Sequence, residues 1–343
     1  SAGFRQFFKT ACRAIFYAAC VFAVGYVLIV WPVYQFHTWN YPAERQAADT
    51  TFNLASFGFR PAADSVVWMS DKPILRPFAQ YLLGVLMVIQ RAGGGNTTYF
   101  LGEVTNVGWT SYFPTVYLLK ETLPFHILTL IALIFAAFKI FKSAKEKSNE
   151  PKTERMKNWL ANHFAETAML LFIAFYWFMS MRGNLNIGIR HLLPVLPLTY
   201  VLVAGKISEW MKPKTDEKIG SWLFAFTVML KNYLKRTFRS ALVGILMLWL
   251  ALEVILVFPH YLSYFNEIAG ATANGYKYAV DSNYDWGQDL KRLIRYVEKK
   301  KIAKIGVDYF GGGSPKYYLG EKFIPWWSSR GEPPKNTWLA VSA

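Results

Sequence analysis

The sequence predicts a mainly α-helical polytopic membrane protein with about five transmembrane helices and a small α/β domain outside the membrane at the C-terminal end. Hydrophobic residues make up 53% of the 343 residues and charged residues only 17%, whereas a soluble globular chain carries about a quarter charged residues. Lysine and arginine flank long apolar stretches instead of being spread evenly. This composition excludes disordered, fibrous and disulfide-scaffold proteins.

Five apolar stretches are long enough, or nearly long enough, to cross a bilayer. The third is short for a hydrocarbon core of ~30 Å, so we expect its helix to extend toward Leu160 or the bilayer to be locally thinner. The fourth carries Arg190 and His191 at one end and contains Pro194 and Pro197. The predicted spans are 14–33, 123–141, 167–181, 187–203 and 241–258.

The distribution of basic residues orients the predicted spans. Lysine and arginine are in excess before the first span, between the second and third, and between the fourth and fifth. In segment 35–119 basic and acidic residues are balanced. All basic-rich segments therefore fall on one side of the membrane, which the positive-inside rule assigns to the cytoplasm. Topology thus explains the net charge of +16, and the sequence predicts no nucleic-acid partner.

These assignments divide the chain into four parts. Residues 1–34 hold the cytoplasmic N-terminus and the first span, and 35–119 form an outer, periplasmic loop. Residues 120–258 hold the other spans with their basic cytoplasmic loops. Residues 259–343 form a periplasmic α/β domain, which we expect the end of the sequence to cut short.

Two segments predict helices that lie on a membrane surface. Apolar residues recur with a helical spacing between positions 74 and 89, which predicts an interfacial helix over 73–91 on the outer side. The apolar segment 221–230 is too short to cross the bilayer, so we expect it to lie at the inner face.

The last part of the chain has the pattern of a small α/β unit. Residues 287–300 show apolar positions at helical spacing, and 315–319 are typical of a short helix. Residues 302–309 and 337–342 are typical of strands. The strand–helix–strand order predicts a partly parallel sheet.

Four distinctive strings occur near the outer ends of the predicted spans. They are 101–114 (LGEVTNVGWTSYFP), 118–124 (LLKETLP), 184–197 (NLNIGIRHLLPVLP) and 261–290 (YLSYFNEIAGATANGYKYAVDSNYDWGQDL). Together they resemble the C-terminal half of bacterial membrane glycosyltransferases related to family 39. That group is similar to protein O-mannosyltransferases and lipid A aminoarabinose transferases and has the GT-C architecture. The resemblance covers nearly the whole chain after the first span.

The resemblance implies a function in the bacterial cell envelope. The donor would be a polyprenyl-phosphate-linked sugar, transferred on the periplasmic side of the inner membrane among membrane lipids. The family keeps its catalytic aspartate in the first outer loop, upstream of several further spans, and no acidic residue precedes Trp31 here. We therefore expect the catalytic base to lie upstream and this chain alone not to transfer sugar. A divalent metal is a candidate cofactor of the intact enzyme.

Three basic residues are candidates for binding the donor phosphate. Arg190 and His191 lie at the mouth of the fourth predicted span, where a charged pair is costly unless it meets an anion or reaches the headgroups. Arginine presents a planar fork of donors to phosphate oxygens. Lys120 is the second candidate contact. The alternatives are that Arg190 only reaches toward lipid headgroups and that Lys120 pairs with Glu121.

Sugar binding is predicted in the first string. Asn106, Trp109 and Tyr112 combine aromatic faces, which stack on C–H surfaces, with groups that bind hydroxyls. Trp and Tyr also occur in any membrane-interface belt, which is the alternative. Glu103 and Glu121 lie beside these strings and are the candidates for an auxiliary acidic role.

Polar residues elsewhere are weaker candidates. Asp281, Asn283 and Asp285 have a calcium-loop spacing, but an EF-hand needs Gly and Glu where Trp286 and Arg292 stand. We therefore expect these acids to cap a helix start, with Asp285 accepting backbone N–H bonds and Asp289 near its positive end, rather than to bind metal. His126 and Glu253, inside predicted spans, are either functional or buried and hydrogen-bonded.

Two other classes compete with the glycosyltransferase. A membrane transporter should show inverted repeats with paired broken helices, and no such repeat is visible in the sequence. A lipid-handling or structural subunit without catalysis would not need a charged pair beside an aromatic, polar outer loop.

The topology is directly testable. We predict that segments 142–165 and 206–238 are cytoplasmic and that 35–119 is outside, because every basic-rich segment then lies inside. In a Cys12→Ser, Cys20→Ser background, a membrane-impermeant thiol reagent should label Lys72→Cys in intact cells and leave Lys147→Cys unlabelled. Labelling of Lys147→Cys from outside would show that the orientation is wrong.

Overall fold

The computed structural model describes residues 2–145, 151–212, 222–333 and 335–342. Lys147, Lys214 and Lys218, which contribute to the basic bias of the predicted cytoplasmic loops, lie outside the described residues. The chain forms two compact units, Ser1–Gly94 and Gly95–Ala343, and each is described by itself.

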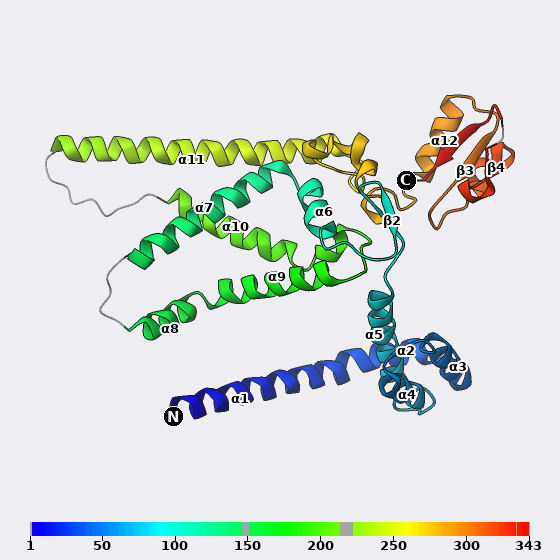
Figure 1. The fold of residues 1–343 in the computed structure, drawn as a ribbon, viewed down its shortest axis with the longest axis horizontal. Helices are drawn as coiled ribbons and strands as arrows, with labels where there is room; N and C mark the ends of the chain where they lie inside the picture. Colours follow the sequence, from blue (N-terminus) through cyan, green and yellow to red (C-terminus); the bar gives the residue numbers. More distant parts are fainter. Residues whose placement is uncertain (1, 146–150, 213–221, 334, 343) are drawn as a thin grey trace. The chain divides into compact units, whose positions relative to one another are not determined.

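The protein is mainly helical, and four segments in its described part are long and apolar enough to cross a membrane (Figure 1). Their apolar side chains are largely exposed, as expected of surfaces that face lipid rather than a protein core. They coincide with the first, second, third and fifth predicted spans. The four segments are Phe8–Thr38, Leu123–Ser143, Phe164–Arg182 and Phe226–Val257.

The fourth predicted span, 187–203, has different bounds from those expected. A short 3-10 helix, η2 (Ile189–Leu192), is followed by helix α10 (Leu196–Met211), which has 16 residues. Proline disfavours a helical conformation in the residue before it and is well suited to a helix's first turn, so Pro194 and Pro197 delay the start of the helix. A membrane crossing by α10 remains a prediction.

The first unit begins with a nearly continuous helical segment. Helix α1 (Ala2–Gly25) passes through a π-helical turn, η1 (Tyr26–Val30), into α2 (Trp31–Thr38). Three further helices follow, α3 (Ala43–Asn53), α4 (Arg60–Met69) and α5 (Arg76–Gly94). Their buried core consists of Leu54, Phe57, Ala63, Val66, Ala79, Leu83 and Leu86.

Helix α5 confirms the helix predicted over 73–91, but two of its faces, rather than one, pack against other parts of the first unit. Ala79 and Leu83 are buried in the core with α4, whereas Phe78 stacks on Tyr26 at 4.8 Å between ring centroids. Ile89, part of the predicted apolar stripe, is 53% exposed. Ala63 of α4 and Ala79 of α5 are both fully buried. Their small side chains allow the two helices to pack closely, and Ala79 is not one of the residues of the predicted apolar stripe.

The second unit holds the remaining membrane-length helices. They are α7 (Leu123–Lys145), α9 (Phe164–Arg182) and α11 (Trp222–Val257), joined by α8 (Lys152–Asn162) and α10. Helices α7, α10 and α11 share a buried cluster of apolar side chains. This cluster contains Phe125, Leu128, Ala132, Val203, Ile207 and Leu246.

The prediction of a separate surface helix over 221–230 is wrong, because residues 222–257 form one uninterrupted helix, α11. No proline occurs in this segment, and its first glycine is Gly244, so nothing in the local sequence ends a helix near residue 230. The basic residues between 231 and 239 therefore lie on a helix rather than in a loop. Helix α9 begins at Phe164, three residues before the predicted start at 167, so it extends toward Leu160 as expected without reaching it.

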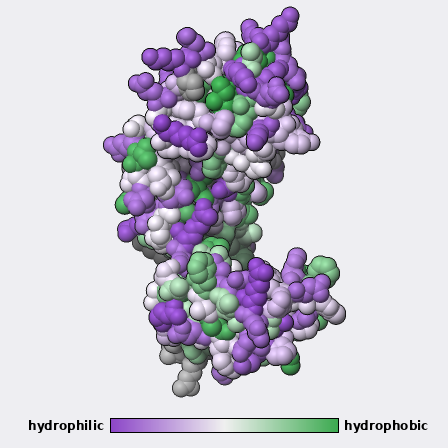
Figure 2. All heavy atoms as spheres, turned by 90° about the vertical axis from the view of Figure 1, so that its right-hand side faces the viewer, coloured by the Kyte–Doolittle hydropathy of each residue, from purple (hydrophilic) through white to green (hydrophobic). Residues whose placement is uncertain are grey.

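The C-terminal segment confirms the predicted small sheet. Strands β3 (Ile305–Asp308), β4 (Phe323–Pro325) and β5 (Trp338–Val341) are parallel in the order β4-β3-β5, next to α12 (Leu290–Lys299) and α13 (Pro315–Leu319). Strand β4 was not predicted, since it has three residues and ends in proline. On the face shown in Figure 2, hydrophilic residues predominate around this sheet.

Candidate functional site

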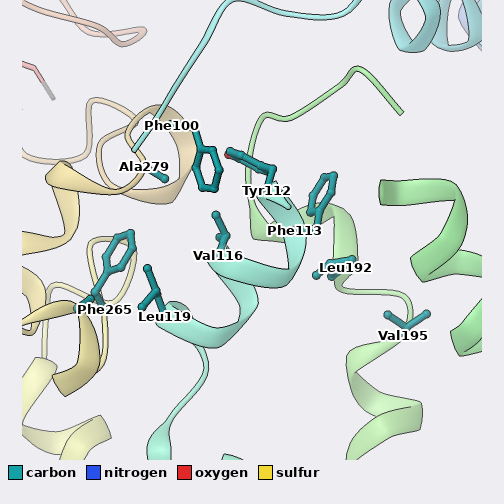
Figure 3. Close-up of a cluster of buried hydrophobic side chains, with 10 residues drawn as sticks. Phe100, Tyr112, Phe113, Val116, Leu119, Leu192, Val195, Phe265 and Ala279 are labelled. Carbon is teal, nitrogen blue, oxygen red and sulfur yellow. The ribbon is translucent and has the colours of Figure 1, made fainter. Parts of the chain in front are cut away.

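The four distinctive strings come together at one buried junction (Figure 3). Its centre is helix α6 (Tyr112–Lys120), which carries Tyr112 and Leu119. Phe265 lies beside Leu119, and Leu192 lies on the other side of α6 beside Phe113. We call this cluster the junction; its members are Phe100, Tyr112, Phe113, Val116, Leu119, Leu192, Val195, Phe265, Ala269 and Ala279.

A short hairpin closes the junction from the side of the first string. Strands β1 (Thr98–Phe100) and β2 (Glu103–Thr105) pair in antiparallel register, and Phe100 packs against Tyr112 with ring centroids 5.1 Å apart. Leu101 N donates a hydrogen bond to Tyr278 O, at 3.0 Å. The hairpin therefore joins the first string to the fourth.

Three buried asparagines tie the strings together. Asn186 Oδ1 accepts a hydrogen bond from Trp109 N at 2.7 Å, which joins the third string to the first. Asn266 Nδ2 donates to Leu118 O at 2.7 Å and Glu121 O at 2.8 Å, which joins the fourth to the second. The exposed fraction of each of these two asparagines is 1%. A buried polar atom without a partner is costly, and Asn186 Nδ2 has none in the described part of the chain, so Asn186 joins the strings through its oxygen alone.

Asn283 is the third and connects three strings at once. Its Oδ1 accepts from Ile189 N at 3.0 Å, and its Nδ2 donates to the Tyr112 hydroxyl at 2.7 Å. Its main-chain oxygen accepts a hydrogen bond from Lys120 Nζ. The side chain is fully buried, with an exposed fraction of 0%. Asn283 therefore fixes the positions of α6 and η2 relative to the fourth string.

Lys120, expected to contact the donor phosphate, is used inside the protein. Besides Asn283, its Nζ donates to Leu262 O at 2.8 Å, and it lies 4.6 Å from the centre of the Phe265 ring. Burial lowers the pKa of Lys120 to about 7. Two of its three donors are thus bound to main-chain carbonyls, which gives this lysine a structural role.

Glu121 does not pair with Lys120. Its Oε2 accepts a hydrogen bond from the Tyr200 hydroxyl at 2.7 Å, and its Oε1 accepts from Thr122 N at 3.1 Å. The carboxylate therefore joins the start of α7 to α10, and Asn266 holds its main-chain oxygen.

Arg190 and His191 face different surroundings. The Arg190 guanidinium lies over the Trp286 ring, 4.3 Å from its centre, and in the described part of the chain no carboxylate forms an ion pair with it. The His191 ring packs edge-on against Phe113 at 6.4 Å, and its main-chain oxygen accepts from the Tyr176 hydroxyl at 2.7 Å. Arg190 thus remains available to an anion, whereas His191 packs against the junction.

The three predicted sugar-binding residues differ in how far they are exposed. Tyr112 is only 1% exposed, and its hydroxyl accepts from Asn283, so it belongs to the core of the junction. Asn106 is exposed. Trp109 is half-buried, and its Nε1 donates to Glu103 Oε2 at 3.4 Å. Glu103, Asn106 and Trp109 therefore form the part of the first string that a ligand can reach.

The residues with calcium-loop spacing are not arranged around a cation. Both side-chain atoms of Asn283 bind protein groups, and Asp285 Oδ1 accepts from Gly287 N at 2.7 Å. In residues 2–145, 151–212, 222–333 and 335–342 no group of three or more His, Cys, Asp or Glu is placed to hold a metal. Asp285 accepts a backbone N–H bond as predicted, but in the turn before α12, and Asp289 lies at the N-cap of α12, near the positive end as predicted.

The two polar residues within predicted spans are hydrogen-bonded. His126 Nε2 lies 3.1 Å from Leu118 O, and Glu253, 8% exposed, accepts from the Tyr264 hydroxyl at 2.7 Å. Both contacts favour the structural alternative for these residues. The sequence analysis did not identify Asn186, Asn266 or Trp286 as important. The asparagines in the distinctive strings could have indicated buried hydrogen-bonding positions.

No protein-family model matches the chain, and neither a curated protein nor a solved structure matches it. The class is therefore defined by the chain's own features. It is a mainly helical protein with membrane-length helices, a junction where four loop strings meet, and a small parallel sheet.

Asn283→Ala should destabilise the second unit markedly. It leaves Ile189 N and the Tyr112 hydroxyl without a partner, and each orphaned buried group costs about 1–3 kcal/mol. The measurement is hydrogen exchange of α6 and residues 186–192 in detergent-purified protein, which should become at least about tenfold faster. Asn162→Ala, at an exposed helix end, is the matched control. Unchanged exchange in Asn283→Ala would refute the role of this residue.

Lys120 should make stability depend on pH. Its pKa in the folded chain is about 7 against 10.5 for an ordinary lysine, so between these values the unfolded chain binds more protons. Stability should therefore rise with pH in this window, by at most about 1.4 kcal/mol per pH unit. The unfolding midpoint of Lys120→Met measured from pH 6.5 to 9.5 should lack this rise, whereas Lys277→Met should keep it. Equal pH slopes in Lys120→Met and the unmodified chain would contradict the assignment.

Proposed function

We propose that this chain is part of a membrane glycosyltransferase of the bacterial inner membrane. It transfers a sugar from a polyprenyl-phosphate-linked donor to an acceptor on the periplasmic side, and this portion supplies donor-phosphate binding and the C-terminal domain. The observation that carries the proposal is Arg190, which lies at the junction, stacked on Trp286 and without a carboxylate partner among the described residues.

The position of Arg190 suits a lipid-linked phosphate. It lies in η2, between the end of α9 at Arg182 and the start of α10 at Leu196. Helix α7 begins beside the same junction, at Leu123. With the topology expected from the basic residues, this is the outer end of the helices. The phosphate of a membrane-embedded donor lies at that level, between the lipid chains and the water.

The contact with Trp286 leaves the donors of Arg190 free. A guanidinium that stacks on an aromatic face uses its flat side, so the N–H groups along its edge can bind phosphate oxygens. The indole holds the guanidinium without neutralising its charge, as a carboxylate would. Trp286 is itself 54% exposed, which offers an aromatic surface to a sugar next to the phosphate.

The first string would complete the site with hydroxyl-binding groups. Trp109 and Glu103 are joined by a hydrogen bond, and Asn106 lies exposed between them in the sequence. Glu103 thus remains the candidate for an auxiliary acid that orients the acceptor. Lys120 and Tyr112 have a structural role at this site, because their polar atoms form hydrogen bonds with protein groups.

Replacing Arg190 tests this proposal in the intact enzyme. Losing a charge-assisted hydrogen bond costs about 1.5–3 kcal/mol, so Arg190→Ala should lower kcat/KM for lipid-linked sugar roughly ten- to hundredfold. Arg190→Lys should restore only part of the loss, since it keeps the charge but not the fork.

The matched control is Arg330→Ala, which removes another arginine stacked on a tryptophan, 3.5 Å from the centre of the Trp327 ring. It should leave kcat/KM unchanged. Turnover of Arg190→Ala at the unmodified rate would show that the phosphate is bound elsewhere.

A further inference from the structure

A groove lies at the carboxyl edge of the C-terminal sheet. Strands β3 and β5 end there at Asp308 and Val341, and α12 begins beside them at Leu290. The groove has a volume of about 190 Å³. In sheets of parallel strands the carboxyl edge is where ligands usually bind, because the loops that follow the strands diverge there.

Hydrogen bonds fix the walls of the groove. The Tyr309 hydroxyl donates to Gly287 O at 2.9 Å, and Phe310 N donates to Ser342 Oγ at 3.1 Å. Gly287 has a positive φ of 77° and passes close to the main chain of Phe310, so a side chain there would collide with the opposite wall. Hydrogen bonds between side chains and the main chain therefore hold the walls in place, and the absence of a side chain at Gly287 lets the two loops approach closely.

Carboxylates make up most of the polar part of the groove: Asp285, Asp289 and Asp308 line it beside the hydroxyls of Tyr309 and Ser342, and Asp289 forms an ion pair with Arg292. Asp285 Oδ1 accepts from Gly287 N, and Asp308 Oδ2 accepts from Ser328 N at 2.9 Å. Asp285 Oδ2 and Asp308 Oδ1 have no hydrogen-bond partner in the described part of the chain. Ionised carboxylates only accept, so a ligand must supply donors such as hydroxyl or ammonium groups. A phosphate or carboxylate ligand would be repelled.

The rest of the lining is apolar and sets the size of the ligand. Leu290 and Leu293 from α12 lie opposite Val307 and Ala340 from the strands. Such a surface suits the C–H face of a ring rather than a fully hydrated ion. The volume is below the roughly 300–1,000 Å³ of sites for drug-sized molecules, which limits the occupant to about one ring.

We propose that this groove binds a single hydroxyl-rich ring, an uncharged or amino-bearing monosaccharide unit. Asp285 and Asp308 accept hydrogen bonds from its hydroxyl groups, and Leu293 packs against its C–H face. The assignment of this sugar to the acceptor rests on the proposed function, whereas binding itself does not. Asp285 lines the groove, and the next residue in the chain, Trp286, contacts Arg190.

Binding can be measured without turnover. The full chain, purified in detergent, is titrated with glucose, mannose, galactose, N-acetylglucosamine and glucosamine, and binding is followed by saturation-transfer NMR. Glucose 6-phosphate, titrated into the Arg190→Ala chain so that the proposed phosphate site does not contribute, tests the exclusion of anions. We expect saturable binding of at least one uncharged or amino sugar and none of the phosphate.

Variants locate the bound sugar. Asp285→Asn and Asp308→Asn each turn one acceptor into a donor and should weaken binding about tenfold or more. Leu293→Trp should fill the groove and abolish binding. Glu298→Gln, on the exposed face of the same helix, should bind like the unmodified chain. Circular dichroism verifies that each variant is folded.

The results separate this inference from the proposed function. Absence of binding by every sugar in the set, or equal binding by a folded Leu293→Trp chain, overturns the groove proposal. Equal binding of glucose 6-phosphate by the Arg190→Ala chain overturns it as well. Sugar binding together with wild-type turnover in Arg190→Ala keeps the groove and refutes the phosphate site instead.

Discussion

The hydrogen bonds of one buried amide hold the candidate site together. Asn283 joins the turn that carries Arg190, the helix that carries Tyr112, and the lysine at the end of that helix. A buried donor or acceptor without a partner is costly, so the strings must meet in an arrangement that satisfies the amide of Asn283. Asn186 Oδ1 and Asn266 Nδ2 link Trp109 and the start of α7 to the same junction, although Asn186 Nδ2 has no partner in the described part of the chain.

This constraint separates structural residues from available ones. Lys120, Tyr112 and Glu121 have chemistry that suits a transferase, but their polar atoms bind protein partners. Arg190 differs because its neighbour is an aromatic face, which holds the guanidinium in place without using its N–H donors. The residues available to a ligand are therefore positioned by buried hydrogen bonds of the neighbouring residues, as precise positioning of a substrate requires.

The helices and the sheet contribute in different ways. Four helices in the described part of the chain expose apolar side chains over a length that matches a bilayer. Irregular segments such as η2 and the loops of the fourth string need buried partners for their main-chain groups, and the junction provides them. The parallel sheet has its own apolar core, which includes Val297, Ile305 and Val307. The groove lies at the carboxyl edge of this sheet.

The sequence by itself determined the helical class, two of the membrane-length helices (α7 and α9) to within a few residues, α12, α13 and two of the three strands of the C-terminal sheet. Those features depend on local periodicity, which is read within one segment. Only the tertiary structure decided which candidate residues are free, because the partners that hold Lys120, Tyr112 and Asn283 lie between 94 and 171 positions away in the chain. The bounds of α10 and α11 also differed from expectation, since α11 continues through basic residues that hydropathy alone assigns to a loop. Hydrogen bonds between distant segments produce no periodic pattern in the sequence. The composition of the strings therefore indicated a site, but it did not show which of the side chains face a ligand.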